Sequence, residues 1–361
     1  MRWLDHHVKG APNRVDLEPR YECAVTPASP VAYNDQHAAW PHRFSPTWPP
    51  ATPEQHLYLH DNGTLTAAAP TAAEPDQVIT HALPAGYTLA DFIAEGGGAW
   101  APWITIPAVQ EEYVGTPLTA ETEIFGRPRL TMAVTVNNFH FQLSATLWAR
   151  IAGLGDRFLS SGTVGRRLAI PGQHQIEIVM RDAAFVLPPG ARLVVKLSNL
   201  PLDNPPGQNR MHWVPDLHGS FIANVHISDQ LPAELHLPVA TRRGVDFTPR
   251  LTEASAAAGI TLPMAIAAGL GRGNSFYAIL FSFSGIAPPV TALGETIWIN
   301  PDPLTASYVQ TGLLDNLGRA GPSFGIAPGI APPGIRIAMA AIVLDLPGIV
   351  ASTPIQLAVS N

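Results

Sequence analysis

The segment Phe185-Val-Leu-Pro-Pro-Gly-Ala-Arg-Leu-Val-Val-Lys-Leu-Ser-Asn199 decides the fold class of the chain. Its Pro188-Pro189-Gly190 predicts a tight turn, because proline fixes φ at about −65° and glycine tolerates the left-handed region. The side chains of residues 192–197 then alternate between two faces, one of them wholly apolar. This is the period of a strand that a core covers on one face. The segment therefore predicts a turn followed by a half-covered β-strand.

The composition favours many short strands over helices. Charged residues make up 14% of the 361 residues, against about 25% in an ordinary globular protein. The exposed faces of helices need Glu, Lys and Arg, whereas short apolar strands need turns, and the chain holds 37 prolines and 30 glycines. A chain of this length is expected to form two or three domains, each with its own core.

Charge, hydropathy and cysteine content exclude several classes of partner and site. The net charge of −7 is spread without a basic run, so we expect no nucleic-acid partner. No window approaches the roughly 18 apolar residues of a membrane helix, and the start, Met1-Arg-Trp-Leu-Asp-His-His7, lacks the apolar core of a signal peptide. Cys23 is the single cysteine, so neither an intramolecular disulfide nor a cysteine-based zinc site is expected.

Other segments repeat the strand pattern on both sides of the first one. The alternating residues 56–60 are followed by Asp61-Asn62-Gly63, which is a strong hairpin signal. Tyr21 to Val25 has the character of a further strand within an otherwise irregular region. The remaining strand-like segments of the first 240 residues are 113–118, 129–136, 139–148, 172–180 and 234–239.

In their order, these segments resemble the C-terminal jelly roll of the cocaine esterase and X-prolyl dipeptidyl-peptidase family of serine hydrolases. The start Trp3-Leu4-Asp5-His6-His7-Val8-Lys9-Gly10 is similar to the helix that ends the α/β-hydrolase domain of that family, downstream of its catalytic histidine. One turn departs from the family, because Asn138-Phe139-His140-Phe141 stands where Asp-Thr-Asp-Phe is usual. The resemblance implies that the Ser, Asp and His of the catalytic triad are absent from this chain.

The resemblance and a change of composition predict an all-β chain of four parts. Residues 1–20 would be a short helical remnant of the α/β-hydrolase domain, and 21–55 an irregular connection. Residues 56–240 would form a galactose-binding-like jelly roll, and 246–361 a second, smaller β-sandwich. The second sandwich is similar to a β module at the C-termini of secreted bacterial proteins. Residues 241–244 predict an exposed linker between sandwiches that fold independently.

No catalytic, metal or cofactor site is predicted from motifs. Gly273-Asn-Ser-Phe-Tyr277 begins like a nucleophile elbow, but Tyr277 stands where glycine is needed, so Ser275 is expected in a turn that leads into a strand. Gly269-Leu-Gly-Arg-Gly273 is expected to be a loop. The chain has 13 histidines. His56 and His60 would stand about 13 Å apart on a strand, too far to share one zinc ion.

Trp100 and Trp103, next to the glycine run Gly96-Gly97-Gly98, are the only candidate binding residues. They either plug one end of the sandwich or, as the resemblance implies, line the rim of a substrate pocket. Exposed aromatic side chains on a loop are also typical of a sugar-binding face.

Three functions follow. The first is the non-catalytic C-terminal part of a serine hydrolase that cleaves esters or X-Pro dipeptides, shaping the substrate pocket and stabilising the catalytic domain. Its partner would be the missing α/β-hydrolase domain, and its ligand a small ester, peptide or sugar. The second is a stand-alone carbohydrate- or ligand-binding module, and the third an enzyme that uses the histidines. The location is left open, although a parent with a secreted-type module would be secreted or periplasmic.

Overall fold

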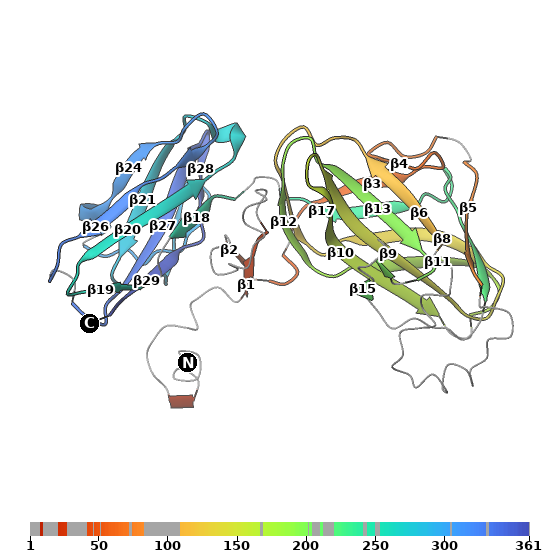
Figure 1. Ribbon diagram of the computed structural model, residues 1–361, viewed down its shortest axis with the longest axis horizontal. Coiled ribbons are helices and arrows are strands. Elements are labelled where there is room, and N and C mark those ends of the chain that lie inside the picture. The colour runs from red at the N-terminus through yellow and green to blue at the C-terminus, as the bar shows by residue number, and fades with distance from the viewer. Residues whose placement is uncertain are drawn as a thin grey trace.

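A computed structural model of the chain is almost entirely β (Figure 1). It describes residues 8–9, 21–26, 42–45, 47–50, 52–71, 74–82, 109–166, 169–200, 202–203, 210–211, 220–240, 244–249, 253–303, 305–329 and 332–360. Two β-sandwiches lie side by side, and a small hairpin lies between them. The all-β fold class predicted from the sequence is confirmed.

The first sandwich is a jelly roll whose strands connect in one continuous sheet that folds into two layers (Figure 1). The order along the sheet is β10-β9-β13-β6-β4-β3-β17-β8-β16-β5, with β11 paired to β8. Its strands are β3 (Glu54–Leu59), β4 (Thr64–Thr66), β5 (Gln77–His81), β6 (Gln110–Gly115), β8 (Arg129–Val136), β9 (Phe141–Ile151), β10 (Gly155–Arg166), β11 (Gly172–Val179), β13 (Arg192–Ser198), β16 (Phe221–Val225) and β17 (Glu234–Pro238). Two short pairs accompany it, namely β7 (Thr122–Gly126) with β12 (Ala183–Leu187), and β14 (Leu202–Asp203) with β15 (Arg210–Met211).

The segment that decides the fold forms β12, a turn and β13. Gly190 has φ +82°, and the backbone N–H of Ala191 donates to the carbonyl of Pro188 at 3.2 Å, as the Pro-Pro-Gly sequence predicts. The core covers one face of β13, as expected, through Leu193, Val195 and Leu197, and the other face has one exception to its exposure. Val194, on the polar face of the pattern, is fully buried because it lies directly opposite Trp148 of β9. The indole of Trp148 covers this second face.

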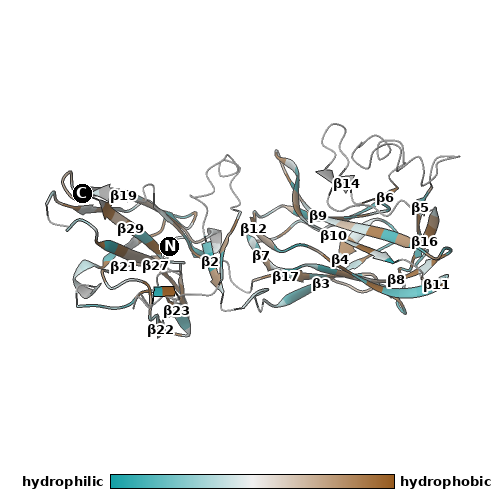
Figure 2. Cartoon of the chain, turned by 90° about the horizontal axis from the view of Figure 1, so that it is seen from below, coloured by the Kyte–Doolittle hydropathy of each residue, from teal (hydrophilic) through white to brown (hydrophobic). Residues whose placement is uncertain are grey.

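The two layers of the jelly roll enclose an apolar core and leave hydrophilic residues outside. Fully buried aromatic and aliphatic side chains such as Tyr113, Phe141 and Leu130 fill the space between the layers. β3 and β11 are coloured as hydrophilic at the outer surface of one layer (Figure 2). This outer surface, carried by β3, β17, β8 and β11, is where several histidines gather.

The second sandwich encloses a separate core between two sheets. One sheet has the order β18-β20-β25 with β26 on β20, and the other has the order β19-β29-β27-β21-β24 with β28 on β27. The stacked rings of Phe281 and Phe324, 4.4 Å apart, join the two sheets. Its strands are β18 (Asp246–Pro249), β19 (Glu253–Ser255), β20 (Ile260–Ala267), β21 (Phe276–Ser282), β24 (Gln310–Leu313), β25 (Arg319–Ala320), β26 (Ser323–Ile326), β27 (Arg336–Asp345), β28 (Gly348–Ala351) and β29 (Ile355–Ser360). A separate pair, β22 (Val290–Ala292) with β23 (Glu295–Ile297), accompanies them.

The hairpin between the sandwiches consists of β1 (Tyr21–Ala24) and β2 (His42–Ser45). On one side, Thr26 exchanges backbone hydrogen bonds of 2.9 Å with Ala184 and Val186 of β12. On the other side, the ring of Phe44 lies edge-on to Trp298 of the second sandwich, with centroids 6.1 Å apart. The connection predicted as irregular therefore contacts both sandwiches.

The other predictions from the sequence have mixed outcomes. Ser275 lies in the turn that leads into β21, as expected, and Asn274 there has φ +61°. The loop before it contains one 3₁₀ turn, Leu270–Arg272. Most of the N-terminal helix prediction and residues 241–243 lie outside the described residues. In the described part of the chain, no helix is long and apolar enough to cross a membrane.

Candidate functional site

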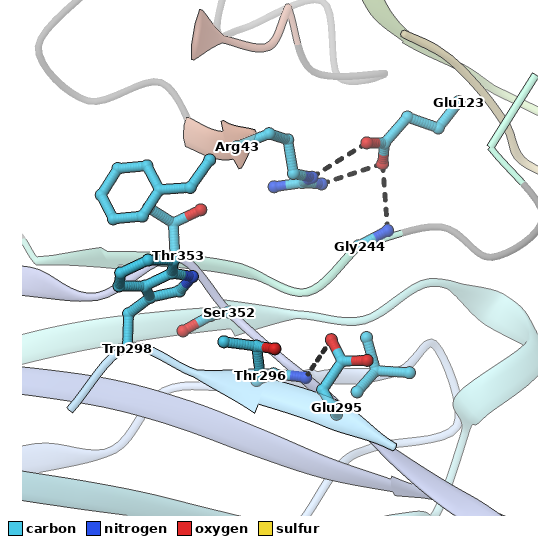
Figure 3. A pocket seen from close by; sticks show the side chains of 11 residues that line it. Arg43, Glu123, Gly244, Glu295, Thr296, Trp298, Ser352 and Thr353 are labelled. Carbon is cyan, nitrogen blue, oxygen red and sulfur yellow. Dashed lines mark hydrogen bonds and ion pairs between the residues drawn. The ribbon is translucent and has the colours of Figure 1, made fainter. Parts of the chain in front are cut away.

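The junction of the two sandwiches is built around Arg43 of β2. Its guanidinium donates to both carboxylate oxygens of Glu123 on β7, each at 2.9 Å, and to Oδ1 of Asp246 on β18 at 2.8 Å. Figure 3 shows the paired bonds from Arg43 to Glu123. One side chain of the connecting hairpin thus bridges a carboxylate of the jelly roll to a carboxylate of the second sandwich.

The side chains of this ion-pair network are almost fully buried. The side chains of Arg43, Glu123 and Asp246 are 12%, 3% and 10% exposed. Burial acts against the charged form of Arg43, but the attraction of the two carboxylates outweighs it, so the pKa of the guanidinium is raised above its usual value. A buried charge that loses its partner costs far more than an exposed one, so all three groups depend on one another.

Gly244 completes the network because a larger residue would collide with it. Its backbone N–H donates to Oε2 of Glu123 at 3.0 Å. A Cβ atom at this position would lie 2.3 Å from Nε of Arg43 and 2.5 Å from Cζ. The guanidinium is held by two carboxylates and cannot move aside, so the backbone approach requires glycine.

A pocket of about 300 Å³ opens beside this network (Figure 3). The hydroxyl of Thr353 in its wall donates to the carbonyl of His42, and the N–H of Ala351 donates to Glu295 at 3.3 Å. The lining residues are Arg43, Phe44, Glu123, Gly244, Glu295, Thr296, Trp298, Val350, Ala351, Ser352 and Thr353.

The lining suits binding better than catalysis. Trp298 and Phe44 supply aromatic surface, while Glu295 and Thr296 supply polar groups, which is the usual make-up of a small-molecule site. The lining contains no histidine or cysteine, and the hydroxyl of Ser352 is occupied as the acceptor for the N–H of Ala341 at 2.9 Å. The lining therefore lacks the histidine that activates the nucleophile of a serine hydrolase.

Two histidines elsewhere on the jelly roll connect a threonine hydroxyl to a carboxylate. Nε2 of His226 lies 2.8 Å from Oγ1 of Thr135, and its Nδ1 lies 3.0 Å from Asp76. His60 makes the same arrangement, with Nε2 3.0 Å from Thr66 and Nδ1 2.8 Å from Glu74. Hydroxyl, imidazole and carboxylate follow one another as in a catalytic triad.

These two groups lack the rest of an acyl-transfer site. Thr135 lies near the end of β8 but is paired with a strand on each side, with β11 on one and β16 on the other. Backbone N–H groups used in a sheet cannot also stabilise an oxyanion. The hydroxyl of Thr66 already donates to the carbonyl of Ala68 at 3.0 Å. We therefore interpret both groups as polar links between neighbouring segments.

A third histidine group has a composition suited to metal. One ligating atom each of Glu54, His56 and His236 lie within 4.8 Å of one another. Along the sequence, His56 and His60 stand too far apart to share an ion. His236 comes instead from the neighbouring strand β17, a relation that no sequence spacing shows, so this group was not predicted.

The residues singled out from the sequence do not form a site within the described residues. Trp100 and Trp103 lie outside them, so their placement at a pocket rim stays a prediction. In the described part of the chain, no hydrogen bond joins the Ser275 hydroxyl to a histidine.

No family model and no curated protein matches the sequence. Solved structures of CocE/NonD-type hydrolases resemble it. A CocE/NonD family hydrolase from Staphylococcus aureus has a TM-score of 0.46 at 12% identity, over 66% of this chain and 44% of its own. An aminopeptidase from a marine sediment Thaumarchaeota archaeon has a TM-score of 0.45 at 17% identity, over 66% of this chain and 43% of its own. An α-amino acid ester hydrolase has a TM-score of 0.38 at 17% identity, over 55% and 39%.

The chain spans less than half of the length of each of these three proteins. The activities given in their names are properties of those three proteins.

Proposed function

We propose that the chain is the non-catalytic β part of a serine hydrolase of the cocaine esterase and X-prolyl dipeptidyl-peptidase type. In this role it forms one wall of the substrate pocket and holds the α/β-hydrolase domain in place. The observation that carries the proposal is that the family-like segments lie in one jelly roll and supply its strands. These strands are β3, β6, β8, β9, β11, β13 and β17.

The chemistry of the described residues supports a non-catalytic role. A serine hydrolase needs a nucleophile next to a histidine, a carboxylate that orients the histidine, and free donors for the oxyanion. Ser275 meets none of these requirements within the described residues, and the Thr135 group meets only the first two.

The junction supports a role as a rigid scaffold. A pocket wall must hold its position to within fractions of an ångström, so a supporting part gains from a fixed arrangement of its domains. The buried bridge from Arg43 to Glu123 and Asp246 gives the two sandwiches such an arrangement. We place Trp100 and Trp103 at the substrate side of the jelly roll.

Reconstitution tests this proposal. The purified chain is mixed with the α/β-hydrolase domain of a CocE-type enzyme whose own jelly roll has been removed, and hydrolysis of a p-nitrophenyl ester and an X-Pro-nitroanilide is followed. We expect no turnover by the chain alone and a gain in turnover by the mixture. In the mixture, Trp100→Ala and Trp103→Ala should raise KM more than they lower kcat.

Two outcomes would contradict the proposal. Turnover by the chain alone that Ser275→Ala abolishes would identify it as an enzyme in its own right. A hydrolase domain that gains neither stability nor turnover from the chain would remove the proposed role.

A second candidate is a stand-alone ligand-binding module, which the pocket at the junction favours. Trp298 and Phe44 offer aromatic surface and Glu295 a carboxylate, a combination that suits a sugar. Titration with mono- and oligosaccharides, followed by tryptophan fluorescence, would detect it. Saturable binding that Trp298→Ala removes supports this candidate, and its absence leaves the hydrolase role.

A further inference from the structure

A row of polar side chains crosses three neighbouring strands on the outer face of the jelly roll. In the sheet register, His56 of β3 lies directly opposite His236 of β17, which in turn lies opposite Arg129 of β8. Glu54 precedes His56 by two positions, so both side chains point to the same face of β3. The pairing of β3 with β17 therefore places three groups able to bind a metal ion side by side.

The spacing of these groups is close to that of ligands that share one ion. Oε2 of Glu54 lies 3.4 Å from Nδ1 of His236, and one ligating atom of each residue falls within a 4.8 Å range. Ligands at about 2.1 Å from a tetrahedral ion stand about 3.4 Å apart. The Glu54–His236 pair is already at this separation, and the half-exposed side chain of His56 stands beside it.

Neighbouring residues leave one nitrogen of each histidine available. Nδ1 of His56 is hydrogen-bonded to Glu234, so Nε2 can act as a ligand. Nε2 of His236 lies 3.1 Å from the hydroxyl of Thr131, so the ligand is Nδ1. That Nδ1 atom is buried and makes no hydrogen bond within the described residues. In metal sites, the histidine nitrogen that does not bind the ion is usually hydrogen-bonded to a neighbouring group, as here.

We propose that Glu54, His56 and His236 bind a divalent transition-metal ion of the zinc class, with solvent at the fourth position. Two imidazoles and one carboxylate are a ligand set of zinc sites that keep an open position. Imidazole selects such ions over Mg²⁺ and Ca²⁺, which prefer oxygen ligands alone. This inference does not rest on the proposed hydrolase role.

The surrounding charges permit a cation at this place. Arg129 donates to Glu54 at 2.8 Å and to Glu177 at 2.8 Å, and Glu234 lies beside both histidines. One arginine stands against three glutamates here, so the face is acidic. Arg129 fixes the Glu54 carboxylate, but its positive charge opposes the ion and weakens its binding.

An ion held here would join the strand that opens the jelly roll to the strand that closes it. β3 and β17 are neighbours in the sheet although they lie near opposite ends of the domain sequence. An ion that binds the folded chain alone stabilises it by mass action. Zinc should therefore raise the melting temperature.

Calorimetric titration of the full-length, tag-free chain with zinc chloride tests the site. His6→Ala and His7→Ala are introduced into every protein, because this adjacent pair could add a second site. We expect one zinc ion per chain. His56→Gln and His236→Gln should each weaken binding by about 10- to 100-fold or more, and Thr131→Val by about 10-fold.

Matched controls come from the two histidines that bridge threonine and carboxylate elsewhere. His60→Gln and His226→Gln remove a histidine with comparable partners but outside the group, so zinc affinity should stay unchanged. Circular dichroism checks that each variant is folded, and the half-exposed His56 gives the variant least able to disturb the fold.

The melting temperature gives a second readout. Zinc should raise it in the parent chain and in both controls, but not in His56→Gln or His236→Gln. Absence of one-to-one binding by the parent chain would overturn the proposal. So would binding that survives in the double variant of His56 and His236.

Discussion

Two of the arginines that hold two carboxylates lie in different surroundings, Arg43 at the junction and Arg129 on the outer face of the jelly roll. Arg43 with Glu123 and Asp246 is nearly buried, with side-chain exposures of 12%, 3% and 10%. Arg129 with Glu54 and Glu177 is open to solvent, with exposures of 35%, 33% and 43%.

The bond lengths of the two groups are alike, at 2.8–2.9 Å for the shortest contact of each carboxylate. The difference in solvent exposure therefore decides how much each group contributes to the stability of the fold. In water the attraction is screened and the side chains lose entropy, whereas in the interior an unpaired charge is costly. The junction group fixes the arrangement of the sandwiches, and the outer group leaves its carboxylates available to other ligands.

Arg43→Met should have the largest effect on stability. It leaves Glu123 and Asp246 buried without a cation, which lowers the free energy of unfolding by about 3–5 kcal/mol. Urea denaturation followed by tryptophan fluorescence measures this loss. The triple variant Arg43→Met, Glu123→Leu, Asp246→Leu removes all three charges and should recover most of it. A single variant as stable as the parent chain would show that the bridge is not buried in solution.

Gly244→Ala tests the same group without removing a charge. The new Cβ atom would lie 2.3 Å from Nε of Arg43, so the guanidinium must leave at least one carboxylate. Overpacking of this kind costs about 1–3 kcal/mol. Gly321→Ala, at an exposed position with nothing within 4 Å of the Cβ position and without a positive φ, is the comparison for backbone effects alone. In the double variant with Arg43→Met, the alanine should add little, since the group it displaces is gone.

Asp182 provides an intermediate case with a dependence on pH. Burial acts against its charged form, but hydrogen bonds from Arg127 and Trp48 outweigh this and lower the pKa of its carboxyl. A carboxyl with a lowered pKa stabilises the fold above its ordinary pKa of 3.8, and this contribution is lost as the pH falls.

Asp182→Asn should therefore lower the free energy of unfolding by about 1 kcal/mol at pH 7. The difference between the variant and the parent chain should shrink as the pH falls through the acid range below about pH 4. Urea denaturation at a series of pH values checks both parts. A difference that stays constant down to pH 3 would mean that lost packing, rather than lost charge, explains it.

Arg129→Met should have the smallest effect. Its carboxylates are 33% and 43% exposed and can return to water, so the change in the free energy of unfolding should stay within about 1 kcal/mol. At high salt the loss of stability in Arg129→Met should be smaller still, because salt screens exposed ion pairs. A loss as large as that of Arg43→Met would remove the distinction between the two groups.

The parts of the fold that could be predicted are those fixed by local chemistry. Pro188-Pro189-Gly190 and the alternation after it specify β12, a turn and β13 from neighbouring residues alone. The cover that Trp148 gives to Val194 escaped prediction, because the register that pairs them depends on the whole sheet.

The sites escaped prediction for the same reason. Arg43 lies 80 positions from Glu123 and 203 positions from Asp246 along the chain. His56 and His236 likewise meet only through the pairing of β3 with β17. No spacing in one sequence reveals such partners. Trp100 and Trp103, which the sequence does single out, stay predictions.

Calorimetric unfolding of the unaltered chain tests most directly whether the junction makes one unit of the two sandwiches. The sequence alone predicts sandwiches that fold independently, whereas the buried bridge through Arg43 predicts that neither unfolds without exposing a charge of the other. We expect one cooperative transition, with a calorimetric enthalpy equal to the van't Hoff enthalpy, and two transitions in Arg43→Met. Two separate transitions in the unaltered chain would contradict this account.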